Sequence, residues 1–218
     1  MKRQDKQPRE KRTFWYTFAR LLFSFLSQLL FPIKFHNLQY INQQDAPYML
    51  VSNHVSMFDP PALAIAIKRY EIRFLGKREL NVNPILNYFF NKLHMISVSR
   101  HATDIAAMRA SNEVLKKGQV LGIFPEGTRN KPENFMTDVQ SGLSVLVLRN
   151  KIPLMPAYIH GRIRFFHLNH VYFLPAIPYE DILEEGLGKD SADKLTQRYV
   201  QAITEAKAVA VLELAKKT

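Results

Sequence analysis

The 218-residue chain has no cysteine. This absence excludes disulfide bonds, zinc sites built from thiolates and a cysteine nucleophile, and it is typical of a protein from a reducing compartment. Internal repeats, low-complexity tracts and interior linkers are also lacking. Since 47% of the residues are apolar, the chain can bury a sizeable core, and we expect one domain of α/β type rather than two.

Acidic residues are scarce relative to basic ones. The chain has 19 Asp and Glu against 30 Lys and Arg, which gives a net charge of +11. A balance this basic indicates a polyanionic partner: a nucleic acid, an anionic membrane surface or a phosphorylated substrate. Charge alone does not choose among the three.

No uncharged stretch near the N-terminus is long enough to cross a bilayer. The longest, Leu21 to Ile33, falls well short of the roughly 20 residues that a spanning helix needs. A basic leader precedes it, in which Asp5 and Glu10 are outnumbered by Lys2, Arg3, Lys6, Arg9, Lys11 and Arg12.

The segment 13–33 has the pattern of an amphipathic helix with a wide apolar face. Its polar residues recur at steps of three or four: Thr13, Thr17, Arg20, Ser24, Ser27 and Gln28. Its apolar residues cover the rest of the circumference: Phe14, Trp15, Phe18, Leu21, Leu22, Phe25, Leu26 and Leu29. We therefore expect residues 1–44 to form a basic leader and a membrane-interface helix, drawn to anionic head groups. The protein would then be monotopic, on the cytoplasmic face of the cell membrane.

Two alternatives compete with a membrane-interface helix. A secretory signal also begins with basic residues and a short apolar core, but no small-residue cleavage site follows the segment 31–34. An ordinary amphipathic helix docked on the protein's own core would show a similar periodicity. Trp15, Tyr16 and several phenylalanines beside a basic leader favour the membrane.

Residues 45–218 alternate short β-rich runs with helical patterns. The expected strands are 48–52, 71–76, 95–99, 119–124 and 154–161, with one or two more in 164–179. The expected helices are 60–69, 83–93, 103–117, 138–150 and 191–217. This alternation predicts an α/β fold with a mainly parallel or mixed sheet flanked by helices, in which ligands bind at the carboxyl ends of the strands.

Three polar stretches each follow a predicted strand. They are "NHVSMFDP" (53–60), Arg100 and "PEGTRN" (125–130). Because a parallel sheet brings such loops to one edge, a histidine, two carboxylates and two arginines would share one cleft. Such a group is suited to acid–base chemistry on a phosphorylated or carboxylate-bearing substrate.

His54 and Asp59 can meet only if the chain bends between them. Five residues at roughly 100° each leave them about 140° apart on a continuous helix. Asp59 followed by Pro60 and Pro61 is typical of a helix N-cap and first turn, which places His54 in the loop before the helix. A simpler interpretation is that Asp59 only caps the helix and His54 is an ordinary turn residue.

Several sequence blocks resemble those of the glycerolipid acyltransferases. "NHVSMFDP" resembles the N-H-x-S-x-x-D-P block of that family, and "FPEGTRN" (124–130) resembles its F-P-E-G-T-R block. "GKREL…NP…ISVSR" and "IPLMPAYIHG" resemble the second and fourth blocks, so that order and spacing agree over residues 45–162. Within the family, the resemblance is greatest to the 1-acyl-sn-glycerol-3-phosphate acyltransferases.

The resemblance implies transfer of a fatty acyl chain to the sn-2 hydroxyl of lysophosphatidic acid, giving phosphatidic acid in phospholipid biosynthesis. A neutral histidine can take the hydroxyl proton, so we expect His54 to be the general base and Asp59 to orient it. No cofactor is expected, and acyl-CoA or an acyl carrier protein thioester is the co-substrate. With no G-x-S-x-G motif, direct attack by the acceptor is the simplest route. Ser56 is a rival nucleophile, although turn hydrogen bonding also explains a serine there.

The phosphate of the substrate would be bound by Arg100 and Arg129, whose guanidinium groups match phosphate oxygens bidentately. Gly127 and Thr128 can present backbone N–H groups. Glu126 would orient an arginine or the glycerol hydroxyl, and the alternative is a structural ion pair with one of the arginines.

Two further features receive weaker assignments. Pro153 and Pro156 would shape a wall of the acyl or thioester-donor channel, unless they are plain strand-edge prolines. The motif "HLNH" (167–170) could suggest a metal, but a lone histidine pair in a strand pattern does not support one, and no metal is expected.

Two other functions stay open at the level of sequence. His94 stands where the family commonly has glycine and Ser99 where it commonly has aspartate, which would suit another acceptor such as a lyso-aminolipid. A non-catalytic basic protein that binds membranes or nucleic acid would also explain the charge. Aromatic residues cluster in the N-terminal segment instead of alternating with Lys and Arg, so no nucleic acid partner is expected.

Overall fold

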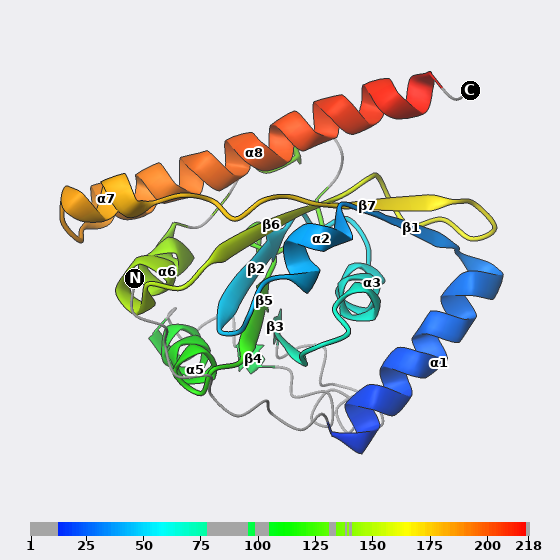
Figure 1. The fold of residues 1–218 in the computed structure, drawn as a ribbon, viewed down its shortest axis with the longest axis horizontal. Helices are drawn as coiled ribbons and strands as arrows, with labels where there is room; N and C mark the ends of the chain where they lie inside the picture. Colours follow the sequence, from blue (N-terminus) through cyan, green and yellow to red (C-terminus); the bar gives the residue numbers. More distant parts are fainter. Residues whose placement is uncertain are drawn as a thin grey trace.

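A computed structural model describes residues 13–77, 96–98, 105–130, 134–137, 139 and 141–216. Within these residues the chain forms a seven-stranded sheet in the order β1-β7-β6-β2-β5-β3-β4 (Figure 1). The strands are β1 (Ile33–His36), β2 (Tyr48–Ser52), β3 (Ile72–Lys77), β4 (Ile96–Val98), β5 (Val120–Ile123), β6 (Leu154–Ile159) and β7 (Asn169–Phe173). The helices are α1 (Phe14–Leu30), α2 (Leu38–Asn42), α3 (Asp59–Ala66), α5 (Ile105–Lys116), α6 (Gly142–Asn150), α7 (Glu180–Glu184) and α8 (Lys189–Ala215).

The sheet is mixed, as the sequence predicts. Neighbouring strands pair in parallel, except that β6 and β7 are antiparallel. The expected helix 83–93 lies outside the described residues, while the other expected helices and strands appear with small shifts at their ends. The α/β fold flanked by helices is therefore confirmed.

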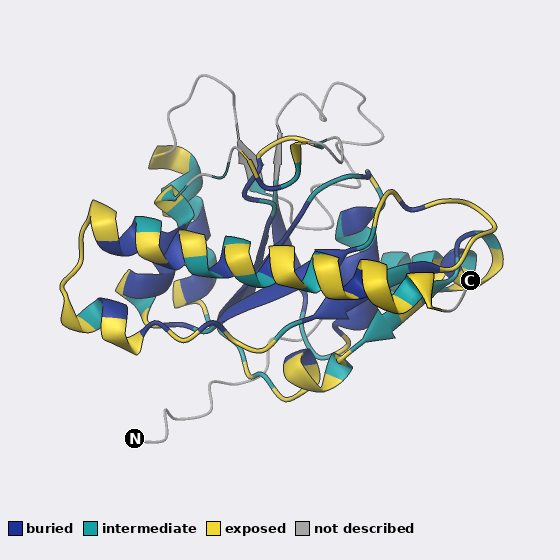
Figure 2. Ribbon diagram, turned by 90° about the horizontal axis from the view of Figure 1, so that it is seen from above, coloured by how far each residue is buried: buried dark blue, intermediate teal, exposed yellow. Residues whose placement is uncertain are grey.

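Alternating side chains of the strands build two cores, one on each face of the sheet. In β2, Met49 and Val51 pack with α5, α6 and α8, whereas Tyr48 and Leu50 pack with α2 and α3. β2 is buried along its whole length, as expected for an apolar central strand covered on both faces. Figure 2 shows the same layering from above, with exposed outer helical faces over buried strands.

The sequence pattern did not predict two elements, the strand β1 and the helix α2. β1 adds a strand at one edge of the sheet. β1 pairs in parallel with β7, from Ile33 opposite Asn169 to His36 opposite Tyr172. Ile41 of α2 is buried in the core beside Leu50. The α/β body therefore begins by residue 33, although the sequence placed residues 33–44 with the N-terminal segment.

α1 exposes its apolar face, whereas an ordinary surface helix exposes its polar face. Its inward face carries the buried residues Tyr16 and Ser27. Its outward face is a row of exposed large apolar side chains: Phe14, Trp15, Phe18, Leu21, Leu22, Phe25 and Leu29. α1 therefore packs on the protein through its narrow polar face and leaves its apolar face exposed, whereas an ordinary docked helix turns its apolar face inward. The membrane-interface role stays a prediction.

Polar contacts hold α1 in this orientation. The Tyr16 hydroxyl accepts a hydrogen bond from the Ile72 N–H at 3.1 Å. The buried carboxylate of Glu71 accepts hydrogen bonds from the backbone N–H and the hydroxyl of Thr13, the N-cap residue of α1. A carboxylate at a helix N-terminus is favourable because it meets unpaired N–H groups and the positive end of the helix dipole. None of the described helices has the length and hydropathy required of a membrane span.

Gly122 in β5 leaves the space that the ring of Phe74 occupies. A Cβ at Gly122 would lie 2.5 Å from Cε1 of Phe74 and 2.7 Å from Cγ2 of Ile72. Phe74 in turn stacks on Phe124, with ring centroids 5.8 Å apart. Because Gly122 has no side chain, the Phe74 ring can lie against β5 and stack on Phe124.

We predict that Gly122→Ala lowers the free energy of unfolding by about 1–3 kcal/mol, because buried rings must shift to accept the methyl group. Chemical denaturation measures this change. Gly142→Ala is the matched control, since nothing lies within 4 Å of its added Cβ, and it should stay within about 0.5 kcal/mol of the parent. Equal effects of the two substitutions would contradict the crowding at Gly122.

Candidate active site

The candidate site lies at the carboxyl ends of the central strands. The loop 53–58 follows β2 and leads into α3, and the loop 124–130 follows the adjacent strand β5. Nδ1 of His54 lies 2.9 Å from Oδ2 of Asp59. The predicted bend that brings these two side chains together is therefore confirmed.

Asp59 organises the loop that carries His54. Its Oδ2 also accepts hydrogen bonds from the backbone N–H groups of Val55 and Ser56, both at 2.7 Å. The prediction that Asp59 is an N-cap is wrong: Phe58 holds that position and Asp59 is the first helical residue. The carboxylate points back into the loop because the three donors are there. All three hydrogen bonds go to Oδ2, while Oδ1 of the buried carboxylate has no hydrogen-bond partner among the described residues.

The contact with Asp59 sets the tautomer of His54. An ionised carboxylate only accepts hydrogen bonds, so Nδ1 must carry the proton and Nε2 of the neutral ring has a free lone pair. Nε2 makes no hydrogen bond to another described residue, and the side chain is 19% exposed. The ring stacks on Phe124 with centroids 4.2 Å apart. This is the geometry that the predicted general base requires, and the catalytic role of His54 stays a prediction.

The loop 124–130 binds the backbone of His54 from both sides. Oε1 of Glu126 accepts a hydrogen bond from the His54 N–H at 3.1 Å, and the Asn130 N–H donates to the His54 carbonyl at 2.9 Å. Gly127 sits between them with φ +63°, which favours glycine, and its N–H donates to the Phe124 carbonyl at 3.0 Å. The two sequence blocks form one structural unit.

Asn53 fixes the other side of the loop. Its side-chain amide donates to the carbonyl of Ile159 at 3.0 Å and accepts from the Ile159 N–H at 2.8 Å. This pair of hydrogen bonds ties β2 to β6 at the point where both strands end. Sequence reasoning assigned no role to Asn53, Phe124 or Asn130, although all three lie within or beside the quoted motifs.

The predicted phosphate ligands are only partly described. Arg129 is exposed and forms no ion pair with any described residue. The Thr128 hydroxyl donates to Oδ1 of Asn130 at 3.0 Å. Arg100 lies outside the described residues. Substrate binding by Arg100, Arg129 and Thr128 stays a prediction.

Glu126 is buried and bound to backbone instead of to an arginine. Within the described part of the chain it forms no ion pair, which leaves the structural ion pair with Arg129 unsupported. Oε2 is buried without a hydrogen-bond partner among these residues. Burial raises the pKa of Glu126 to about 7, although the hydrogen bond from the His54 N–H acts in the opposite direction.

The structure bears on the predicted roles of three further residues, Gly127, Pro153 and Pro156. The N–H of Gly127 is used in the turn to Phe124, so it is not free to bind a phosphate as expected. Pro153 precedes β6, which runs parallel to β2, and therefore lies at the opposite end of the strands from His54; its place in a channel wall stays a prediction. Pro156 is buried inside β6, opposite Val51, and a role in the acyl channel stays a prediction.

The remaining sequence candidates have structural explanations. The Ser56 hydroxyl accepts a hydrogen bond from the Phe58 N–H at 3.2 Å, which confirms the expected turn. Among the described residues, no group of three or more His, Asp or Glu side chains is arranged to hold a metal ion. Nδ1 of His170 lies 3.0 Å from Nε2 of His36, and the part of the chain that the structure describes supplies no third metal ligand to this pair.

Comparison with known proteins places this geometry in a family. A family model described as Acyltransferase matches residues 32–160, more than half of the chain. The chain belongs to the acyltransferase family.

Two bacterial relatives illustrate the similarity. A Bacillus subtilis protein named 1-acyl-sn-glycerol-3-phosphate acyltransferase is 28% identical over 117 residues, which are 54% of this chain and 57% of that protein. A Streptococcus pneumoniae protein of the same name is 28% identical over 159 residues, 72% of this chain and 58% of that protein. The chain spans about half the length of the curated relatives it matches.

A solved structure shares the fold. The crystal structure of the 1-acyl-sn-glycerophosphate acyltransferase PlsC from Thermotoga maritima superposes with a TM-score of 0.64 at 21% identity. The match covers 89% of this acyltransferase and 78% of the other chain. At this identity the likeness establishes the fold of the chain.

Glu126 generates a prediction about pH and stability. Its pKa in the folded protein, about 7, is above the ordinary value of 4.5, so the folded state keeps a proton that the unfolded state loses. The stabilising contribution of the protonated side chain is complete below pH 4.5 and is lost as the pH rises toward 7.

We therefore expect the parent protein to lose stability relative to Glu126→Gln between about pH 4.5 and 7, at up to about 1.4 kcal/mol per pH unit. Glutamine keeps an oxygen that can accept the His54 N–H and carries no charge at any pH. Urea denaturation of both proteins across this range measures the difference. Parallel stability profiles would show that Glu126 titrates at an ordinary pKa.

Proposed function

We propose that this acyltransferase esterifies the sn-2 hydroxyl of lysophosphatidic acid with a fatty acyl chain from a thioester donor, acyl-CoA or acyl carrier protein, and yields phosphatidic acid. The observation that carries the proposal is the 2.9 Å contact between Nδ1 of His54 and Asp59, which leaves Nε2 as a base at the strand ends. The names of the relatives support the choice of acceptor.

The first chemical step is attack on the thioester. The acceptor hydroxyl gives its proton to Nε2 of His54 as its oxygen forms a C–O bond to the carbonyl carbon. The imidazolium that results is stabilised by the Asp59 carboxylate, which is already aligned by the N–H groups of Val55 and Ser56. No loop reorganisation is needed to receive the proton.

The second step is collapse of the tetrahedral adduct. The C–S bond breaks, and the imidazolium returns its proton to the leaving sulfur, so His54 ends in its starting tautomer. No acyl-enzyme forms. The position of Ser56 agrees with this route, because its side chain is buried and its oxygen is bound to the Phe58 N–H.

The acceptor phosphate would be bound by Arg129 and Arg100. Arg129 is exposed on the loop that holds His54, and no described carboxylate pairs with it, so its guanidinium donors would be available for phosphate oxygens. Binding the head group from this loop would position the neighbouring hydroxyl relative to Nε2.

The lipid substrates fit a protein that works at a membrane surface. The outward face of α1 exposes seven large apolar side chains, and a helix of this kind lies in the head-group region with its apolar face toward the acyl chains. Anionic lipids would attract the basic chain, with its net charge of +11. The cytoplasmic face of the cell membrane is the proposed location.

The acyl-transfer activity can be tested with His54→Ala. Without the base, transfer of labelled acyl chains to lysophosphatidic acid should fall by about 10²–10⁴-fold. Ser56→Ala is the matched control in the same loop and should keep activity within about tenfold. Both donors are supplied in separate reactions, and circular dichroism verifies the fold.

Undiminished transfer by the His54→Ala protein would overturn the mechanism. A burst of acyl-enzyme in the parent protein that disappears in Ser56→Ala would show that Ser56 is the nucleophile and would also overturn it. A panel of acceptors tests the substrate. Lysophosphatidic acid should react best, and a preference for lysolipids without a phosphate monoester, such as a lyso-aminolipid, would contradict the proposed acceptor.

A further inference from the structure

The loop that joins β6 to β7 exposes an unusual concentration of apolar side chains. Residues 161–168, here the 161–168 loop, present Phe165, Phe166 and Leu168 to solvent with exposed fractions of 48%, 76% and 55%. Single exposed apolar residues are common on protein surfaces, but three within four positions indicate a contact surface.

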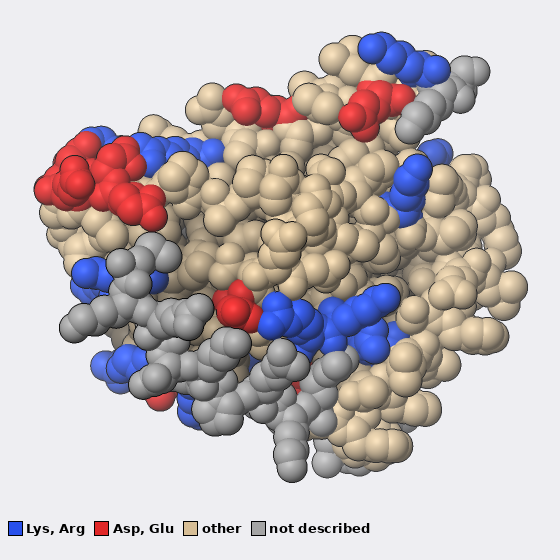
Figure 3. All heavy atoms as spheres, in the orientation of Figure 1, with Lys and Arg blue, Asp and Glu red and all other residues tan. Residues whose placement is uncertain are grey.

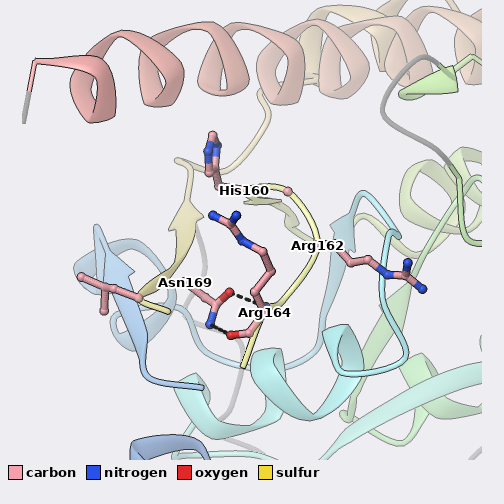
Figure 4. Close-up of a pocket in the computed structure, with 6 residues that line it drawn as sticks. His160, Arg162, Arg164 and Asn169 are labelled. Atoms are coloured by element: carbon pink, nitrogen blue, oxygen red, sulfur yellow. Dashed lines mark hydrogen bonds between the residues drawn. The ribbon is translucent and has the colours of Figure 1, made fainter. Parts of the chain in front are cut away.

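The structure holds this loop in place with the apolar side chains outward. The side chain of Asn169 is buried, accepts a hydrogen bond from the Arg164 N–H at 2.8 Å and donates to the Arg164 carbonyl (Figure 4). It also donates to the carbonyl of His167. The Phe166 N–H donates to the carbonyl of Leu30. Phe166 has φ +58°, which is strained for a bulky residue. The surrounding hydrogen bonds maintain this conformation and hence the exposure of the ring.

The loop is continuous with the apolar outward face of α1. Leu30, which accepts the hydrogen bond from Phe166, is the last residue of α1. The ring of Phe165 contacts those of Phe31 and Phe58 edge to face, at centroid distances of 5.5 and 5.7 Å. Figure 1 shows the loop and the C-terminal end of α1 at the same end of the molecule. The two apolar surfaces therefore adjoin.

Positive charge flanks the apolar side chains. Arg162 and Arg164 are exposed, form no ion pair with a described residue and line a cavity of about 260 Å³ together with His160 and Asn169. In Figure 4 the Arg164 side chain points toward His160, whereas Arg162 points to the other side of the loop. Burial lowers the pKa of His160, and nearby Arg164 and Lys207 lower it further.

The charges of the described residues have a matching asymmetry. Acidic residues of α7 and the segment after it, Glu180, Asp181, Glu184 and Glu185, lie at the end of the molecule opposite the 161–168 loop (Figure 1). Figure 3 shows this acidic end and, across the same face, a mostly uncharged surface over α1. Asp181 and Glu185 are ion-paired with Arg198 and Lys194, so the asymmetry rests on Glu180 and Glu184. An anionic surface would attract the loop end and repel these two charges.

We infer that the 161–168 loop is a second membrane-inserting element: Phe165, Phe166 and Leu168 enter the head-group boundary beside α1 while Arg162 and Arg164 bind lipid phosphates. Aromatic and aliphatic tips with neighbouring arginines fit an anionic lipid surface, in which apolar burial and charge attraction add. Two contacts, helix and loop, define the orientation of the protein on the membrane, whereas a single helix leaves it free to rotate about the helix axis. The orientation rests on the proposed membrane role of α1.

Tryptophan fluorescence separates the two contacts, because Trp15 on α1 is the single tryptophan of the chain. In a Trp15→Phe background, Phe166→Trp reports on the loop and Leu187→Trp is the matched control. Leu187 is also exposed, but it lies between α7 and α8, at the acidic end. Each protein is mixed with phosphatidylcholine vesicles, with or without phosphatidylglycerol, that contain lipids brominated on the acyl chains.

The bromines should quench the fluorescence of Trp15 in the parent protein and of the tryptophan introduced at position 166. They should not quench the fluorescence of the tryptophan introduced at position 187. Quenching of Trp15 with none at position 166 would overturn the inference, as would equal quenching at positions 166 and 187. Neither result tests the proposed acyl-transfer reaction. That reaction is measured separately with lysophosphatidic acid dispersed in detergent, and a loss of transfer there would contradict the proposed function and not the membrane contact of the loop.

The arginines are tested by vesicle sedimentation. Arg162→Gln and Arg164→Gln should each weaken binding to phosphatidylglycerol-containing vesicles by about fivefold and leave binding to neutral vesicles unchanged. Arg149→Gln, in the last turn of α6, is the control for loss of a positive charge elsewhere. An equal loss in all three variants would show that only net charge matters. Competition by inorganic phosphate without any effect of lipid composition would show a site for the free ion and would also contradict the inference.

Discussion

The hydrogen bond between the His54 imidazole and the Asp59 carboxylate constrains the whole candidate site. The two residues are five positions apart, so the chain must leave β2, turn within a few residues and enter α3 for their side chains to meet. Asp59 stabilises the turn by accepting two loop N–H groups, Asn53 ties the end of β2 to β6, and Glu126 and Asn130 bind the backbone of His54. The motifs are adjacent in space because each satisfies polar groups of the other.

The two buried carboxylates of the site differ in their surroundings, and this difference suits them to different roles. Oδ2 of Asp59 receives three hydrogen bonds, from Nδ1 of His54 and from the backbone N–H groups of Val55 and Ser56. Glu126 receives one hydrogen bond from the His54 backbone, and burial raises its pKa. Each carboxylate also has one buried oxygen without a hydrogen-bond partner among the described residues, Oδ1 of Asp59 and Oε2 of Glu126. Asp59 is thus suited to stabilise an imidazolium, and Glu126 to position the loop. The aromatic cluster of Phe31, Phe58 and Phe165 connects this loop to the proposed membrane surface.

Sequence reasoning was most accurate where local pattern and tertiary environment agree. The apolar run of β2 and the periodicity of α1 and α8 predicted the correct elements, and the proline pair after Asp59 located the bend. β1 was missed because the apolar–polar alternation of Ile33–His36 covers only four residues directly after a long helical pattern, and the strand is stabilised by pairing with β7. The role of Asp59 as a cap was wrong because nearby loop N–H groups compete for the same carboxylate. Placing Pro153 relative to the site requires the direction of β6 in the sheet, which the sequence does not give. Predicting the hydrogen bonds between Asn53 and Ile159 requires knowing that β2 and β6 are neighbours.

The central claim is that Asp59 fixes the tautomer of His54 so that Nε2 is the base. Nitrogen NMR of protein labelled at the histidine ring nitrogens, with His54 assigned by its loss in His54→Ala, tests this directly. The account predicts that neutral His54 carries its proton on Nδ1 and has an unprotonated Nε2, and that Asp59→Asn abolishes this preference. A proton on Nε2 in the neutral parent protein, or a mixture of tautomers unaffected by Asp59→Asn, would contradict the account.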